Sequence, residues 1–247
     1  METKIIDIER AAATHWRGTE EERLGGWLLR AAEGFTGRAN SALPLSDPGL
    51  PLDDALAAVT EWYRTRGLPP MISVPMPLGW TSELDEHLAR RSWQVRPGPA
   101  VVMTADLADV PAPPDVELRV TDGPDAEWLR VHRYRGQSDL PPVRMKVLMS
   151  ARSQAFVSVR DDGKAIAVGR LSVSDGWAGI TSVEVDPACR RRGLGTAITL
   201  GICAEAVARG ADRVFLQVET ENSPAKSLYE RCGFTYSHRY HYRLAPA

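Results

Sequence analysis

Hydrophobic positions in the second half of the chain recur first at every second residue and then at every third or fourth, which predicts strands followed by a helix. Three extended runs, over 154–160, 165–174 and 177–186, are separated by turns that contain Asp-Gly, and this pattern predicts an antiparallel meander. A helical run over 194–209 comes next. The other elements expected in this half are strands over 116–120 and 212–218, extended pieces within 234–244, and helices over 124–134, 142–150 and 223–231.

The first half shows a related order of elements. The elements expected there are a short helix over 7–16, a hairpin of 27–32 and 39–45, a helix over 52–66, a strand over 71–74, a helix capped by Ser82 and a strand over 100–104. Helix, strand, helix and final strand thus recur in both halves, which indicates a faint internal repeat; two unrelated α/β patterns are the alternative. A proline-rich linker at 111–114 divides the chain into expected domains 1–110 and 115–247.

Composition narrows the classes of partner. The 247 residues include 30 Lys and Arg against 32 Asp and Glu, and the formal net charge of −2 argues against a nucleic acid or an anionic membrane as partner. Three cysteines without Cys-x-x-Cys spacing predict neither a disulfide framework nor a metal site. The N-terminus has no apolar signal region and no run reaches the length of a membrane span. We therefore expect a cytoplasmic protein, monomeric or homodimeric, that acts on small molecules.

A basic turn at 190–195 joins an expected strand to an expected helix, in the sequence Arg-Arg-Arg-Gly-Leu-Gly. Helix N-termini leave backbone N–H groups unpaired and carry a partial positive charge, so they bind phosphate where no side chain obstructs the approach. Gly193 and Gly195 are expected to remove such side chains. The segment therefore predicts a pyrophosphate site, and a solvated turn before an ordinary helix is the alternative.

A second motif follows at 222–234, which reads Asn-x-x-Ala-x-x-x-Tyr-x-x-x-Gly-Phe. Together with Arg190-x-x-Gly193-x-Gly195, it resembles the GCN5-related N-acetyltransferases (GNAT). The resemblance implies acetyl-CoA as co-substrate and an α/β fold of the α+β kind, a tandem GNAT fold with a mixed, mostly antiparallel sheet flanked by helices. The first lobe is expected to be degenerate and to bind no CoA, because it has no Arg-x-x-Gly-x-Gly between residues 45 and 54.

The resemblance also implies roles for individual residues. Backbone groups of Val183 and Val185 pair with the pantetheine arm, the basic turn holds the pyrophosphate, and Asn222 contacts the arm further along. The full set of expected cofactor-binding residues is Val183, Val185, Arg190, Arg191, Arg192, Gly193, Leu194, Gly195, Thr196, Asn222, Ala225 and Tyr229.

Two residues are expected to handle protons. Tyr229 is implied as the acid that protonates the departing thiolate, and a helix residue that only packs on the sheet is the alternative. Strand alternation turns Glu184 to the face opposite Val183 and Val185, which makes it a candidate base, with a water chain as the alternative. His238 and His241 are further candidates to line the amine pocket, or ordinary surface histidines.

The first half also resembles, over 22–41 and 62–70, a subgroup of actinobacterial GNAT proteins described in part as N-acetylglutamate synthases. This resemblance implies an amino acid such as glutamate as the acceptor amine. Arg38 is then the expected carboxylate partner, together with Asn40, because guanidinium binds carboxylate through two hydrogen bonds. The alternatives are that both residues satisfy a turn and that the protein is a non-catalytic acyl-CoA sensor or interaction protein.

Overall fold

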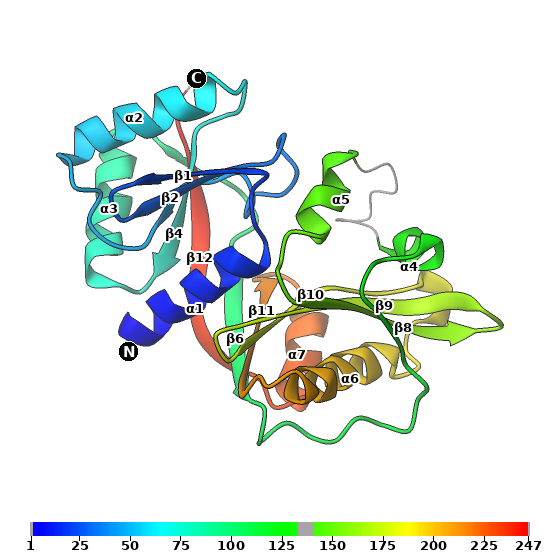
Figure 1. Ribbon diagram of the computed structural model, residues 1–247. Coiled ribbons are helices and arrows are strands. Elements are labelled where there is room, and N and C mark those ends of the chain that lie inside the picture. The colour runs from blue at the N-terminus through cyan, green and yellow to red at the C-terminus, as the bar shows by residue number, and fades with distance from the viewer. Residues whose placement is uncertain (1, 133–140, 247) are drawn as a thin grey trace.

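The computed structural model describes residues 2–132 and 141–246 (Figure 1). The first half contains α1 (Glu2–His15), β1 (Glu20–Leu24), β2 (Trp27–Ala31), β3 (Leu43–Pro44), α2 (Leu52–Arg64), β4 (Met71–Met76), α3 (Gly79–Arg90), β5 (Gln94–Val95) and β6 (Ala100–Asp106). The second half contains β7 (Arg119–Thr121), α4 (Ala126–Val131), α5 (Val143–Leu148), β8 (Gln154–Asp161), β9 (Lys164–Ser174), β10 (Trp177–Val185), the 3₁₀ turn Pro187–Cys189, α6 (Leu194–Ala208), β11 (Arg213–Glu219), α7 (Ser223–Arg231) and β12 (Thr235–Leu244).

A nine-stranded mixed sheet runs through both halves in the order β4-β12-β6-β11-β10-β9-β8-β7, with β5 on the side of β12. All pairs in it are antiparallel except β10 with β11. Helices α4 and α5 lie on one face of the β8–β10 meander, and α6 and α7 on the other (Figure 1). The sequence prediction of a mostly antiparallel sheet flanked by helices is confirmed.

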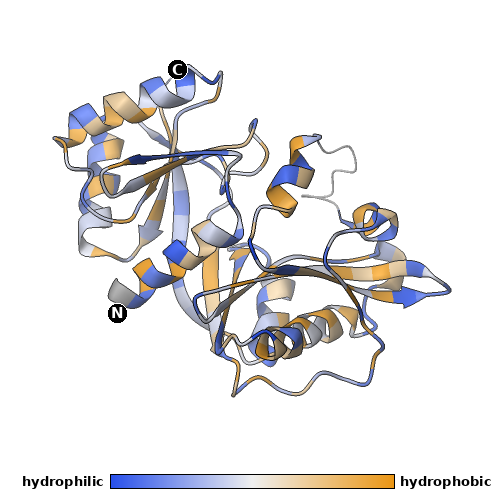
Figure 2. Ribbon diagram, in the orientation of Figure 1, coloured by the Kyte–Doolittle hydropathy of each residue, from blue (hydrophilic) through white to orange (hydrophobic). Residues whose placement is uncertain are grey.

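The main core lies between this sheet and α6. Helix α6 buries most of its length, and hydrophobic residues are prominent along it in Figure 2. Its buried side chains pack with alternate residues of β8 to β11, as period-2 strands that face one covering layer require. A second core in the first half joins α2 and α3 to β2 and β4.

The two halves exchange their final strands. Strand β6, which ends the first half, pairs with β11 over seven residues, from Ala100–Glu219 to Asp106–Arg213. Strand β12, which ends the second half, pairs with β4 over six residues and also with β6. Each lobe therefore completes its sheet with a strand from the other. The division into 1–110 and 115–247 remains a prediction about domains.

Three local expectations differ from the structure. The expected pairing of 27–32 with 39–45 is present only as the short antiparallel ladder of β2 with β3, at Trp27–Pro44 and Leu28–Leu43, whereas the longer hairpin is formed by β1 and β2. The run 38–41 lies in a loop, not in a strand. Helix α3 begins at Gly79 with Leu78 as N-cap, so Ser82 is inside the helix, where its hydroxyl donates to the Leu78 carbonyl. The two closing pieces are one strand, β12, with an irregularity between Tyr236 and His238.

No helix among the described residues has both the length and the hydropathy that a bilayer crossing needs.

Candidate active site

Two neighbouring strands separate in front of the basic turn. β10 and β11 pair in parallel as far as Ile180 and Leu216, and among the described residues the two strands then continue without pairing to each other. On its other edge β10 carries a bulge between Thr181 and Glu184, where Ser182 adopts a φ of +56°. Backbone groups released from a ladder are strong hydrogen-bonding sites. The divergence therefore offers backbone donors and acceptors to an extended, amide-bearing ligand.

The bulge also sets the direction of Glu184. Directly paired residues of an antiparallel ladder point to the same face, and Glu184 is paired with Val168, which packs under α4 and α5. Val183 and Val185 instead border the core cluster under α6. Glu184 and the two valines thus lie on opposite faces of β10, with Glu184 half-buried.

A buried guanidinium fixes the strand beside the bulge. Arg170 is fully buried, and it donates to the carbonyls of Leu148 and His15 at 2.8 and 3.1 Å and contacts the Thr181 hydroxyl at 3.4 Å. Burial, with the positive charge of Arg38 nearby, lowers the pKa of Arg170 to about 9. The group therefore stays charged at neutral pH and joins α1, α5 and β10 at one point.

The basic turn presents an open helix N-terminus. Arg191 and Gly193 have positive φ values of +64° and +77°, and Gly193 is the N-cap of α6 without any side-chain cap. Arg190, Arg191 and Arg192 are exposed. Alternating left-handed residues turn successive N–H groups toward one concavity, which is the geometry of an anion nest. The turn can therefore hold a pyrophosphate through backbone groups, with guanidinium groups at the rim.

The two glycines of the turn have different functions. A Cβ atom at Gly193 would meet nothing within 4 Å, so the space before it is open, and its positive φ favours glycine. A Cβ atom at Gly195 would lie 2.8 Å from Cδ1 of Leu228. Gly195 therefore permits α6 to pack against α7, and its expected role at the phosphate site stays a prediction. The Leu194 side chain belongs to the core, which leaves only its backbone for a ligand.

Helix α7 brings the second motif to the same core cluster. Asn222 caps the helix by accepting from the Ala225 N–H at 3.2 Å, so its side-chain oxygen has a structural partner. Ala225 and Tyr229 border the cluster that Val183 and Val185 also border. The Tyr229 ring packs 6.0 Å from that of Phe234, and burial raises the pKa of its phenol to about 12. The phenol is therefore protonated at every pH at which an enzyme would normally work.

A small cavity of about 180 Å³ lies where both lobes meet the end of β11. Arg38 Nη1 donates to Gln217 Oε1 at 2.8 Å, and the Arg38 guanidinium lies 4.8 Å from the centre of the Trp16 ring. The residues that line this cavity are Thr36, Gly37, Arg38, Arg96, Gly98, Ala100, Gln217, Val218, Glu219, Tyr240 and Tyr242. Arg38 thus contacts Gln217, which directly follows Leu216, the last residue of β11 that pairs with β10.

Asn40 does not share this position. Its side-chain oxygen accepts from the N–H groups of Ala32 and Gly34, and its nitrogen donates to the carbonyls of Phe35 and Thr36. These four bonds use its hydrogen-bonding capacity within the loop that carries Arg38. Asn40 therefore shapes that loop, which was the alternative interpretation from the sequence.

Neither histidine candidate lines this cavity. His238 is buried against Glu9 at 2.8 Å, and His241 lies 2.7 Å from Asp85. Sequence reasoning missed Arg96 and Gln217. Arg96 follows no recognisable motif and precedes an irregular Pro-Gly segment, and Gln217 occupies what reads as an ordinary polar position on a strand.

Comparison with known proteins gives a consistent result. Residues 3–243 match the family described as "Probable histone acetyltransferase Rv0428c C-terminal". The chain is 30% identical over 259 residues to an uncharacterized N-acetyltransferase, YobR, of Bacillus subtilis, covering 97% of this chain and 98% of that protein. It is 34% identical over 163 residues to a mycothiol acetyltransferase of Beutenbergia cavernae, covering 60% and 54% respectively. The fold matches a solved tandem GNAT protein from the clavulanic acid biosynthesis pathway with a TM-score of 0.67, 14% identity and coverage of 98% and 88%.

Proposed function

This chain belongs to the GCN5-related N-acetyltransferase (GNAT) superfamily, and from that premise we propose that it transfers an acetyl group from acetyl-CoA to the primary amine of a small molecule. One observation carries the proposal. Strands β10 and β11 diverge directly before the uncapped, arginine-rich turn that leads into α6. The end of β10, which can bind an extended arm, is thus followed along the chain by the basic turn, which can bind a diphosphate.

The residues of the turn and of α7 fit acetyl-CoA at three points. Gly193 has open space before it, so the N-terminus of α6 can accept the pyrophosphate, and Arg190 to Arg192 can neutralise its charge at the rim. The freed backbone of β10 would bind the pantetheine arm, and Ala225 and the amide nitrogen of Asn222 would flank it. Bound there, acetyl-CoA supplies the acyl group and a thiol as leaving group.

The chain's own groups would then move two protons. Glu184, on the α4–α5 face of β10, would accept the proton that the attacking amine gives up. Tyr229, kept protonated by the raised pKa of its phenol, would donate to the sulfur as the C–S bond breaks. The two groups come from different elements, Glu184 from β10 and Tyr229 from α7.

We further propose that the acceptor is an amino acid, with glutamate as the example suggested by the N-terminal sequence. Arg38 and Arg96 line the small cavity beside the divergence, and guanidinium groups bind carboxylate in a two-bonded geometry. The cavity has a volume of about 180 Å³, which suits a small molecule. The lining has two arginines against one carboxylate, Glu219, and this balance disfavours the lysine-rich tail of a histone, because like charges in a confined site repel. An amino acid explains this cavity better than the histone named in the family description.

A thiol-release assay tests the proposal. Acetyl-CoA is incubated with the protein and with amino acids, the same amines without a carboxylate, or a histone-tail peptide. We expect release only with a carboxylate-bearing amine, together with an acetylated product by mass spectrometry. Release with the peptide alone would contradict the acceptor class, and no release with any amine would contradict catalysis.

Replacing Arg38 by alanine is expected to raise the acceptor KM about 10- to 100-fold with little change in kcat, since a charged hydrogen bond is lost. Arg38→Lys should recover only part of the affinity, because an ammonium group has the charge but not the planar fork. Arg64→Ala, at the exposed end of α2, is the matched control. An unchanged KM in Arg38→Ala would leave this residue as part of the scaffold.

Replacing Glu184 by glutamine should remove an acidic limb of the pH–rate profile. A carboxylate base works only when deprotonated, so the wild-type rate falls as the pH drops through its pKa, and an amide has no such transition. The same acceptor is used for both proteins, so that the ionisation of the amine itself is common to the two profiles. Identical acidic limbs would assign the base to water.

A further inference from the structure

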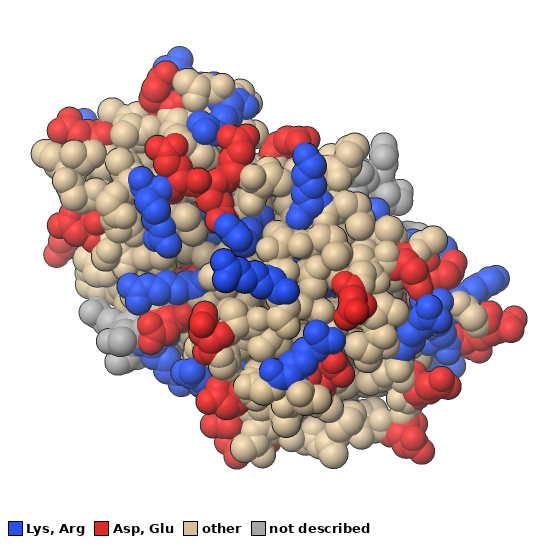
Figure 3. Space-filling model, in the orientation of Figure 1, with Lys and Arg blue, Asp and Glu red and all other residues tan. Residues whose placement is uncertain are grey.

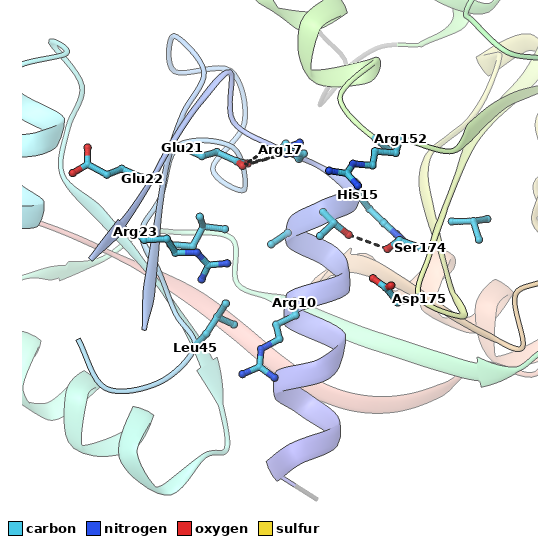
Figure 4. A pocket seen from close by; sticks show the side chains of 15 residues that line it. Arg10, His15, Arg17, Glu21, Glu22, Arg23, Leu45, Arg152, Ser174 and Asp175 are labelled. Carbon is cyan, nitrogen blue, oxygen red and sulfur yellow. Dashed lines mark hydrogen bonds and ion pairs between the residues drawn. The ribbon is translucent and has the colours of Figure 1, made fainter. Parts of the chain in front are cut away.

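A larger cavity of about 840 Å³ lies at the other end of β10, between the two lobes (Figure 4). It opens at the β9–β10 turn, whereas the proposed cofactor loop follows the last residue of β10. Nine strand residues separate the two ends, a distance of about 26 Å along the strand. Its lining residues are Arg10, Ala13, Thr14, His15, Arg17, Glu21, Glu22, Arg23, Leu28, Leu45, Ala151, Arg152, Val173, Ser174 and Asp175. None of these residues lines the cavity that contains Arg38.

The cavity combines apolar walls with guanidinium groups. Ala13, Leu28, Leu45 and Val173 supply apolar surface from α1, β2, the segment after β3, and β9. Four arginines surround it from three separate parts of the chain, namely α1 and its end, β1, and the segment after α5 (Figure 4). Lys and Arg side chains also gather over the junction of the lobes on the face shown in Figure 3.

The acidic residues of the lining do not neutralise all four arginines. Glu21 pairs with Arg17 at 2.6 Å, and Glu22 accepts from the indole N–H of Trp62 at 2.6 Å. Asp175, on the β9–β10 turn, is the third lining carboxylate, so three acidic residues face four arginines. Arg23 and Arg152 are exposed, and no ion pair involves either of them in the part of the chain that the structure describes. Two guanidinium groups are therefore available to a ligand from opposite lobes.

Hydroxyl groups complete the wall on the side of β9. The Ser174 hydroxyl lies 3.0 Å from that of Thr14 and 2.8 Å from His15 Nε2. Burial and the charge of Arg170 lower the pKa of His15 to about 3, and its buried Nδ1 has no hydrogen-bond partner among the described residues. A histidine with neither an orienting carboxylate nor appreciable basicity does not activate a serine, so these groups indicate binding and not hydrolysis.

We propose that this cavity is a second ligand site, distinct from the cofactor and acceptor sites, for a small carboxylate with an apolar alkyl or aryl body. The volume is that of a site for a whole small molecule and exceeds what a bare inorganic anion fills. Arg23 and Arg152, the guanidinium groups without an ion pair, are the partners available to the carboxylate, and the leucines with Val173 cover the body. A purely polar anion would leave those walls uncovered.

Calorimetry with 4-phenylbutyrate as the probe tests the site, with the protein saturated with CoA so that the basic turn is occupied. We expect binding that weakens at higher salt, because the guanidinium groups are exposed. The neutral amide of the same compound should bind at least 10-fold more weakly, since the charged hydrogen bonds are lost.

Variants locate the probe. The double substitution Arg23→Ala with Arg152→Ala should lower the affinity about 10- to 100-fold. Arg38→Ala and Arg190→Ala should leave it unchanged, since these residues belong to the other two sites. Equal affinity in the double variant, loss of binding in Arg38→Ala, or no heat up to millimolar probe would each overturn the proposal. These results do not depend on acetyl transfer, so they stand apart from the proposed function.

Discussion

Gly193→Glu is expected to abolish acetyl-CoA binding, lowering the affinity at least about 100-fold while the chain stays folded. The residue is the N-cap of α6 with a φ of +77°, and its missing side chain opens the nest in which the phosphate oxygens are proposed to lie. A glutamate there would place a carboxylate at the same N–H groups and repel the diphosphate. The strained φ adds a stability cost of about 1–2 kcal/mol, which a domain of normal stability tolerates.

The chain offers a matched control. Gly67 ends the α2 segment with a φ of +65°, and a Cβ atom there would also meet nothing within 4 Å. Gly67→Glu therefore introduces the same strain and the same charge far from the basic turn. Titration calorimetry with acetyl-CoA and thermal unfolding are measured for both variants. Normal affinity in a folded Gly193→Glu protein would remove the pyrophosphate assignment.

Tyr229→Phe is expected to lower kcat about 100-fold or more, with less than about a threefold change in the dissociation constant of acetyl-CoA. The hydroxyl is proposed to act on the leaving sulfur and not on the bound ground state, so its loss appears in turnover. Because burial raises the pKa of the phenol to about 12, the wild-type rate should not fall through Tyr229 ionisation until the pH approaches that value. An alkaline limb at lower pH must belong to another group.

Tyr236→Phe is the control for this substitution, because Tyr236 lies 58% exposed on β12 and the change removes the same hydroxyl elsewhere. Its kcat should equal that of the wild type. If Tyr229→Phe lost affinity and turnover to the same extent, the residue would have a binding role, and if it lost neither, it would only pack on the sheet.

The local features of the fold could be predicted from the sequence. Both Asp-Gly turns of the meander have positive φ at both residues, with Asp162 at +46° and Gly163 at +77° in the first of them, as two-residue hairpin loops require. The basic turn is one continuous stretch of sequence, and so is the α7 motif, so the residue spacing within each can be read directly. Such features depend on neighbouring residues and not on the path of the chain.

Ser82 shows how a local rule failed. A serine before an apolar periodic run is a typical N-cap, yet Thr81 and Ser82 donate back to carbonyls of the preceding turn, including that of Leu78. These bonds are available inside a helix as well as at its start. A serine of this kind therefore indicates roughly where the helix begins but does not identify its N-cap residue.

The acceptor cavity could not be predicted in the same way. Arg38, Arg96, Gln217 and Tyr240 come from four segments of the chain, and they meet only because β6 lies between β11 and β12. The segment 39–45, directly after Arg38, was expected to be a strand, but its first residues lie in a loop. The side chains of Asn40 and Ser41 instead satisfy backbone and arginine groups within the fold.

The exchange of final strands also sets the order in which the chain can fold as it is synthesised. Strand β4 contacts segments of the first half and one strand of the second half, β12. β12 follows β4 in the sequence by more than 150 residues. Until β12 has been made, β4 and β6 expose hydrogen-bonding edges that invite pairing with other chains. The first lobe, although it is translated first, is thus completed last, and its sheet closes only when the second lobe delivers the missing strand.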